Sequence, residues 1–281
     1  MKIVLAAEEA AGMRTLQLVL GSSHQLHAVL ASAPGSGTTG SVAAAADRAD
    51  VPRLDPSLVS DPGFADALAQ AGVDVLLNVH SLRIVAPPVL AAPRFGCFNL
   101  HPGPLPRYAG MNAPSWAVYH GERQHAVTLH WMTATIDAGP IAYSSSVEIS
   151  ERDTGLSVSA TCARRGAQLV ARLLDHLAND PRKVPSADQN LSERRYFGPG
   201  VPHDGWIRWS SAAREIVNFA RACDFGPFPS PWGRPRLRAA DGTPLTAGRV
   251  TASAQPGEGA APGTGRARAA AAPAPPPPPP P

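Results

Sequence analysis

Residues 73–79 read VDVLLNV, a run in which nearly every side chain is aliphatic. A short run of this kind is typical of a strand that is buried on both faces of a parallel sheet. Strand-like character also marks residues 2–6, 26–30 and 95–100. Helical spacing or alanine-rich composition marks residues 12–20, 41–48 and 62–71, with Asp61 as the expected N-cap of the last helix. Strands that alternate with helices indicate a mainly parallel sheet with right-handed crossovers.

The second half of the chain has a different pattern. Strand-like alternation covers residues 126–132 and 141–149, and amphipathic helical spacing covers residues 156–177 and 210–223. The proline-rich residues 225–235 predict an extended connector, and residues 237–246 predict a hairpin that turns at Asp241-Gly242. The predicted fold class is α/β, with a doubly wound, mainly parallel, Rossmann-like sheet and a short C-terminal extension.

Composition divides the chain into three parts. Residues 1–185 carry the alternating pattern, whereas residues 186–251 hold a linker helix and a short remnant of a further unit. Residues 252–281 are dominated by Ala, Gly and Pro and end in a proline run. Because such a segment buries too little apolar surface to offset the entropy lost on ordering, we expect it to be disordered.

Charge and cysteine content limit the classes of protein to consider. The 281 residues carry a formal net charge of +3, and three arginines at or near the tail contribute to it (Arg249, Arg266 and Arg268). No lysine–arginine block occurs, which argues against a dedicated nucleic-acid surface. The three cysteines form no C-x-x-C pair and indicate free thiols in a reducing compartment. Since neither a signal peptide nor an apolar run of about 18 residues is found, we expect a cytoplasmic protein without a membrane partner.

The residues that carry chemistry follow one predicted strand. Residues 98–110 read FNLHPGPLPRYAG, so Asn99 and His101 lie two positions apart and project from one face of the strand. Open α/β sheets bind ligands at the carboxyl ends of their strands. Alone, this triplet is more typical of side chains that close hydrogen bonds in a turn. However, Asp137 follows His101 by 36 positions, in a loop between two predicted strands from which a carboxylate can approach the imidazole.

These stretches together resemble the formyl-tetrahydrofolate-dependent formyltransferase family, which includes methionyl-tRNA, glycinamide ribonucleotide, sugar and hydroxyornithine N-formyltransferases. The resemblance covers about residues 2–235, and HPxxLPRY and DxGPI agree with the family in order and distance. It implies that residues 1–185 are the formyltransferase domain and that Asn99, His101 and Asp137 are catalytic.

Apart from the resemblance, the side chains of these three residues suit formyl transfer. An amine that attacks a formyl carbon creates an oxyanion, which the Asn99 amide and a protonated His101 can stabilise. A carboxylate at Asp137 can orient His101, raise its pKa and receive the amine proton.

The resemblance also implies a formyl donor, 10-formyltetrahydrofolate, and no metal ion. Residues 80–85 resemble the family's pterin-binding loop, and residues 133–138 would line the opposite side. The expected donor-binding residues are Leu82, Arg83, Ile84, Val85, Thr133, Ile136 and Ala138. The absence of G-x-G-x-x-G after the first strand argues against a dinucleotide cofactor.

The expected acceptor is a small amine or a carrier-bound aminoacyl group, which would meet Arg107, Tyr108 and Asn112. The sequence departs from the family near these residues, and these departures bear on the acceptor contacts. Many members have Ser-Leu-Leu where this chain has Gly103-Pro104-Leu105. Many also have Arg where this chain has Ala109, and Thr where it has Ala138.

Three alternatives remain open: formylation of methionyl-tRNA, hydrolysis of formyl-tetrahydrofolate, and a folate-binding module without activity. Residues 32–46 contain no lysine or arginine, which disfavours tRNA because phosphate neutralisation dominates nucleic-acid affinity. Among the remaining histidines, His130 is expected to be a hydrogen-bonded core residue, and His24, His120 and His125 are expected at the surface.

Overall fold

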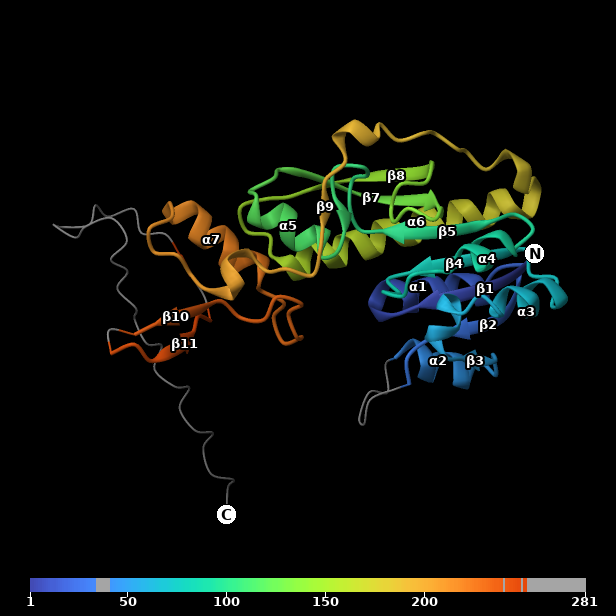
Figure 1. The fold of residues 1–281 in the computed structure, drawn as a ribbon, viewed down its shortest axis with the longest axis horizontal. Helices are drawn as coiled ribbons and strands as arrows, with labels where there is room; N and C mark the ends of the chain where they lie inside the picture. Colours follow the sequence, from blue (N-terminus) through green and yellow to red (C-terminus); the bar gives the residue numbers. More distant parts are fainter. Residues whose placement is uncertain (34–40, 240, 249, 252–281) are drawn as a thin grey trace, which may run out of the picture.

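The computed structural model describes residues 1–33, 41–239, 241–248 and 250–251 (Figure 1). Within these residues, seven strands form a central sheet in the order β3-β2-β1-β4-β5-β7-β8. They are β1 (Lys2–Ala7), β2 (Gln25–Leu30), β3 (Arg53–Leu54), β4 (Val75–Val79), β5 (Cys97–His101), β7 (Gln124–Trp131) and β8 (Ile141–Glu148). The strands from β3 to β5 pair in parallel, while β7 and β8 are antiparallel. The mainly parallel sheet is confirmed. The predicted tail and residues 34–40 of the predicted lysine- and arginine-free loop lie outside the described residues.

Five of the α-helices fall close to the predicted ranges, whereas the short helices at residues 87–91 and 113–119 were not predicted. In the described part of the chain the α-helices are α1 (Glu9–Leu20), α2 (Val42–Arg48), α3 (Phe64–Gln70), α4 (Pro87–Ala91), α5 (Ala113–Tyr119), α6 (Gly155–Asn179) and α7 (Ala213–Ala222). The prediction of Asp61 as an N-cap was wrong, because Gly63 occupies that position and the Asp61 carboxylate accepts from the Gly63 amide at 2.9 Å. Helix α6 starts with a capping box formed by Thr154 and Ser157. The spacing of apolar residues in the sequence does not reveal this cap.

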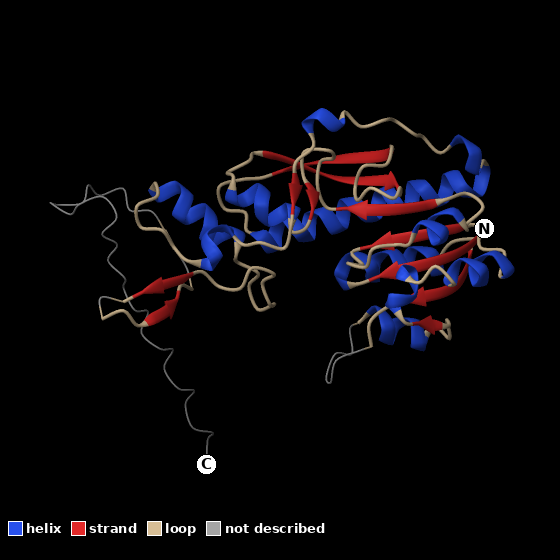
Figure 2. Ribbon diagram, viewed as in Figure 1, coloured by secondary structure: helices blue, strands red, loops and turns tan. Residues whose placement is uncertain are grey.

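Helices cover both faces of the sheet, as Figure 2 shows. Alternate residues of the strands point to opposite faces, so that Ile3 and Leu5 join one apolar cluster and Val4 and Ala6 join another. The first cluster contains buried residues of α1, α2, α5 and α6, and the second contains residues of α3 and α4. The three cysteines are buried free thiols, as predicted. No helix in the described residues is long and apolar enough to cross a membrane.

Helix α6 packs tightly under the strand that carries the candidate site. A Cβ atom added at Gly166 would lie 2.7 Å from the Leu100 side chain of β5, which shows how closely the two backbones approach. Because Leu100 faces α6, its neighbours Asn99 and His101 point to the opposite face of the sheet.

After α6 the chain returns along the sheet. We call residues 184–197 the strap. Its Ala187 pairs with Ile141 of β8, and its end forms β9 (Tyr196–Phe197), which pairs in parallel with β6 (Ala109–Gly110). The strap therefore bridges the two segments that contain Asp137 and the residues after His101.

The C-terminal extension rests on the main body through aromatic contacts. The Trp232 ring centroid lies 4.8 Å from that of Trp116 and 6.3 Å from that of Tyr119, both in α5. Trp232 thus anchors the proline-rich connector against α5. The predicted hairpin is also confirmed, with β10 (Arg236–Arg238) antiparallel to β11 (Pro244–Thr246).

Candidate active site

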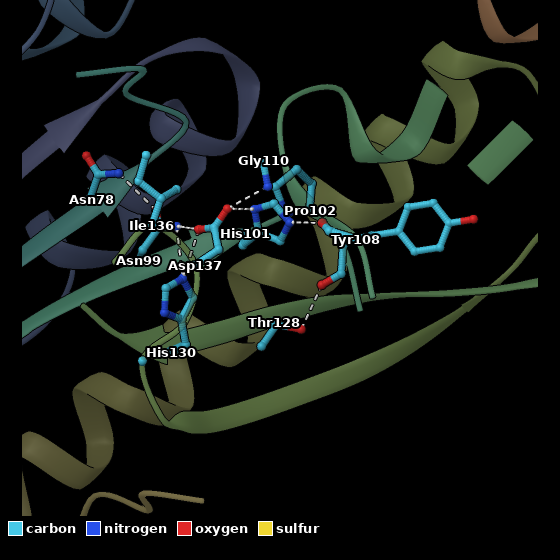
Figure 3. Close-up of polar contacts among 12 residues, drawn as sticks. Asn78, Asn99, His101, Pro102, Tyr108, Gly110, Thr128, His130, Ile136 and Asp137 are labelled. Carbon is cyan, nitrogen blue, oxygen red and sulfur yellow. Dashed lines mark hydrogen bonds and ion pairs between the residues drawn. The ribbon is translucent and has the colours of Figure 1, made fainter. Parts of the chain in front are cut away.

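A row of polar side chains crosses the sheet near the carboxyl ends of β4 and β5. The strand register places Asn99 of β5 opposite both Asn78 of β4 and His130 of β7. The Asn78 amide donates to Asn99 Oδ1 at 2.9 Å, and Asn99 Nδ2 lies 3.1 Å from His130 Nε2 (Figure 3). This row fixes the Asn99 amide with its nitrogen directed toward β7 and Asp137.

The protonation of His130 follows from its neighbours. Its Nδ1 lies 2.8 Å from the Trp131 carbonyl oxygen, which can only accept, so Nδ1 carries a hydrogen. In the neutral ring Nε2 then accepts from Asn99 Nδ2. The same Nε2 lies 3.4 Å from Asp137 Oδ1, and a protonated His130 would pair with that carboxylate.

His101 lies between a carbonyl group and a carboxylate. Its Nε2 donates to the Tyr108 carbonyl oxygen at 2.6 Å, and its Nδ1 is 3.5 Å from Asp137 Oδ2. Burial lowers the pKa of His101 below its ordinary value, and the Asp137 carboxylate and the Tyr108 carbonyl offset this only in part. The resting imidazole is therefore neutral at pH 7, with an unprotonated Nδ1 that faces Asp137.

Asp137 is held by donors on several sides. Its Oδ2 accepts from the Gly110 amide at 2.8 Å, and its Oδ1 accepts from Asn99 Nδ2 at 3.2 Å. Burial raises the pKa of Asp137, but the charge that His101 and His130 carry when protonated and the hydrogen bond from the Gly110 amide lower it by more. The carboxyl group is therefore ionised near neutral pH, and it can accept a proton jointly with His101 Nδ1.

Asp137 thus contacts both of the other predicted catalytic side chains, while the predicted donor-binding residues differ in exposure. Leu82, Ile84 and Ile136 are exposed apolar side chains, with 78%, 66% and 40% of their surface accessible. Val85 is buried in the core beneath the loop. The polar or small members of the two loops are Arg83 and Thr133, both exposed, and Ala138, which is half-buried.

The predicted acceptor residues differ in orientation. Arg107 is exposed, and Asn112 is half-buried at the start of α5 with a left-handed φ of 56°. The Tyr108 ring points away from His101 (Figure 3), and its hydroxyl donates to Glu122 at 2.8 Å. Near His101, Tyr108 thus contributes its backbone carbonyl group.

Sequence reasoning missed some residues that contact this site. His130 was expected to be a core residue, and it is buried, but it also touches Asn99 and Asp137. Asn78 was treated only as part of an aliphatic strand. Asn78 and His130 are polar residues inside buried strands, and a buried polar side chain needs a hydrogen-bond partner. This feature of the sequence could have identified both residues.

The predicted surface positions of His24 and His125 were wrong. Both are buried, and their Nε2 atoms lie 2.9 Å from the Leu174 carbonyl and 2.8 Å from the Pro102 carbonyl. The long helix α6 covers His24 from 150 positions away, a contact that local sequence does not reveal. His120 is exposed, as predicted. No group of three or more metal-binding side chains occurs in the described part of the chain.

Comparison with known proteins finds a matching family and similar folds. A family model described as formyl transferase matches residues 13–174, more than half of the chain. A 4-N formyltransferase from Francisella tularensis has a TM-score of 0.73 and 18% identity, covering 90% of this chain and 98% of that chain. A sugar N-formyltransferase from a Shewanella species has a TM-score of 0.66 and 17% identity, covering 91% and 98%. An N-formyltransferase from Helicobacter canadensis, in complex with folinic acid and dTDP-3-aminofucose, has a TM-score of 0.64 and 19% identity, covering 79% and 80%. At these identities the three structures show a shared fold.

Proposed function

The chain belongs to the formyl transferase family, and we propose that it transfers a formyl group from 10-formyltetrahydrofolate to an amine, with Asn99, His101 and Asp137 as the catalytic residues. The observation that carries this proposal is the convergence of the three side chains. They come from β5 and from the loop between β7 and β8, and Asp137 lies 3.2 Å from Asn99 Nδ2 and 3.5 Å from His101 Nδ1.

The geometry suggests how the proton moves. His101 Nε2 keeps its hydrogen on the Tyr108 carbonyl, so that His101 Nδ1 and Asp137 Oδ2 are two proton acceptors 3.5 Å apart. The attacking amine forms a bond to the formyl carbon and releases its proton to this pair. The C–N bond to the folate then breaks, and the proton returns to the folate nitrogen.

His101, once it has taken up this proton, would stabilise the oxyanion. Its positive charge would attract the oxygen of the tetrahedral intermediate. Asn99 Nδ2 would donate to the same oxygen when one of its hydrogens leaves Asp137 Oδ1 or His130 Nε2. Such preorganised donors act strongly in a buried site, and the loss of one typically lowers turnover by about 10²- to 10³-fold.

Exposed apolar side chains support a folate donor. Leu82 and Ile84 on one loop and Ile136 on the other leave apolar surface exposed, which a flat pterin ring would cover. The relative from Helicobacter canadensis carries folinic acid, which supports the same donor class here. We propose that residues 82–84 and 133–138 line this donor site, with Val85 supporting it from below.

The acceptor proposed is a small amine or a carrier-bound aminoacyl group. Arg107 and Asn112 remain available on the side of His101 where the chain enters α5. The Tyr108 side chain does not support such a role, because its hydroxyl is engaged with Glu122.

The test is an assay of purified protein with 10-formyltetrahydrofolate and separate acceptors: amino-sugar nucleotides, hydroxyornithine, glycyl carrier protein, initiator Met-tRNA and no amine. Mass spectrometry would detect the formylated product, and absorbance would follow release of tetrahydrofolate. His101→Ala is the matched inactive control. We expect formylation of a small or carrier-bound amine at a rate that changes little with salt.

The other outcomes separate the alternatives. Formate release without an amine would identify a hydrolase. Salt-sensitive formylation of tRNA alone would replace the proposed acceptor, because phosphate contacts make binding depend steeply on salt. Folate binding without turnover of any acceptor would contradict the proposed enzyme.

A further inference from the structure

The backbone at Asp137 adopts an unfavourable conformation. Its φ is 53°, in the left-handed region that few residues other than glycine occupy. Such a conformation persists only where surrounding contacts hold it. The contacts to the Asp137 side chain fix the carboxylate, but they do not by themselves fix the path of the loop.

The side chain of Gln189 supplies contacts to the loop backbone. Its Nε2 donates to the carbonyl oxygens of both Asp137 and Gly139, at 3.1 and 2.6 Å. The opposite amide orientation would place Oε1 against two acceptors, so the orientation is determined. Within the described residues Gln189 Oε1 is buried without a hydrogen-bond partner, so the side chain gives up solvent contact to make this clamp.

A second side chain of the strap acts on the same loop. Arg194 donates to the Ile136 carbonyl at 3.0 Å. Gln189 and Arg194 together hold carbonyl groups on both sides of Asp137, and the Gln189 contacts are the ones that reach Asp137 itself.

The strap is fixed at both ends relative to the site. On one side, the Trp131 indole donates to the Pro185 carbonyl at 2.8 Å, which ties the strap to β7. On the other side, the Met111 amide donates to the Phe197 carbonyl at 2.7 Å, next to the Gly110 amide that binds the Asp137 carboxylate. In Figure 1 this segment runs from the end of α6 past β8 to β9. The strap can therefore hold both the loop that contains Asp137 and the Gly110 segment that binds its carboxylate in a fixed relative position.

We propose that Gln189 is a positioning residue that holds the Asp137 backbone so that the carboxylate faces His101. This inference rests on the proposed function, since it assigns Gln189 an effect on the reaction only through Asp137. Displacement of a reacting group by about 1 Å can lower the rate about 100-fold. Removal of the Gln189 donor is therefore expected to lower kcat by about 10- to 100-fold.

The experiment compares Gln189→Met, which keeps the length but removes the donor, with the matched control Asp188→Asn at the exposed neighbouring position. Both are measured in the wild-type and Asp137→Asn backgrounds, under steady-state conditions with the best acceptor of the wild type. We expect Gln189→Met to lower kcat more than tenfold and to change KM for 10-formyltetrahydrofolate less than threefold, because Arg194 still holds Ile136. In the Asp137→Asn background the same change should alter kcat less than twofold. The control should match wild type.

Two results would overturn the inference while leaving the proposed function intact. One is an active wild type with an equally active Gln189→Met variant. The other is an equal loss from Gln189→Met in both backgrounds, which is the behaviour of a side chain that only supports folding. If the wild type formylates no acceptor, the proposed function itself has failed.

Discussion

Replacement of Asp137 by asparagine is the most informative single change to this site. It keeps the size and shape of the side chain and removes its charge. In the protein, the carboxylate accepts from the Gly110 amide and Asn99 Nδ2 and lies 3.5 Å from His101 Nδ1. An asparagine offers one acceptor to these two donors, so one donor is left facing an amide nitrogen.

The size of the effect on catalysis follows from the distance to His101. Two unit charges 3.5 Å apart interact by about 5 kcal/mol at an effective dielectric constant of about 20. Only 4% and 7% of the two side-chain surfaces are exposed, so solvent screens this interaction little. Because burial lowers the pKa of His101, the charged pair forms mainly when the amine proton arrives. The loss should therefore fall on kcat and reach about 10³-fold or more, at 1.4 kcal/mol for each factor of ten.

Stability should change much less than the rate. The unmatched donor in Asp137→Asn costs about 1–3 kcal/mol, which would lower the melting temperature by several degrees. Affinity for a folate donor analogue, measured by calorimetry, should stay within a few-fold, since the substituted atom acts at the formyl carbon.

The assay is single-turnover formyl transfer by the wild type, Asp137→Asn, His101→Ala and the double variant. Residues that act as one unit lose little more together than singly. We expect the double variant to match the slower single variant within about tenfold. The shared proton-accepting role would be refuted by either of two results. One is an Asp137→Asn variant that keeps a tenth of the wild-type rate. The other is a double variant whose loss of rate equals the product of the two single losses.

Three further predictions follow from other parts of the molecule. Burial lowers the pKa of His125 to about 4, so the unfolded chain binds the proton first as pH falls. The contribution of the neutral His125 to the free energy of unfolding is complete above pH 6.5. It is lost as the pH falls toward 4, by about 3 kcal/mol in all. Urea unfolding of His125→Gln should show a shallower decline over that interval, and an unchanged slope would contradict this. A Cβ at Gly139 would collide with the Trp131 carbonyl oxygen, whereas one at Gly198 meets nothing within 4 Å; Gly139→Ala should therefore lower both kcat and melting temperature, and equal behaviour of Gly198→Ala would argue against the collision. A chain that ends at Thr251 should keep its folate affinity and melt within about 2 °C of the full chain, and strong hydrogen-exchange protection in residues 252–281 would contradict this.

The central strands could be predicted because their residues are apolar almost without interruption. Residues 73–79 contain β4, which is buried throughout, and residues 95–100 overlap β5. A run of this kind is buried in any arrangement that has helices on both faces, so its assignment does not depend on the tertiary structure. The ends of the elements were less accurate, since caps and turns depend on neighbours. Asp61, for example, binds the Gly63 amide without starting the helix.

The candidate catalytic residues could also be predicted in part. Asn99 and His101 share a face of β5 because strand side chains alternate, and this property needs only the sequence. The distance of 3.5 Å between His101 and Asp137 could not be predicted from residue types, since loop conformation sets it. The prediction of a charged His101 depended on Asp137 alone, whereas burial has the larger effect and lowers its pKa.

The sequence by itself determined the mainly parallel sheet, the strand that presents Asn99 and His101, and the family resemblance carried by Asp137. The first two depend on periodicity within single segments, and the resemblance depends on motifs in two segments and the distance between them. Only the tertiary structure decided that His130 lies opposite Asn99, because antiparallel register between β5 and β7 is set by packing across the sheet. It also decided that Gln189, 52 positions beyond Asp137, reaches back to its carbonyl group. This contact forms only when the strap has folded back along the sheet. The sequence near Gln189 and the sequence near Asp137 do not indicate it, because the fold alone brings the two segments together.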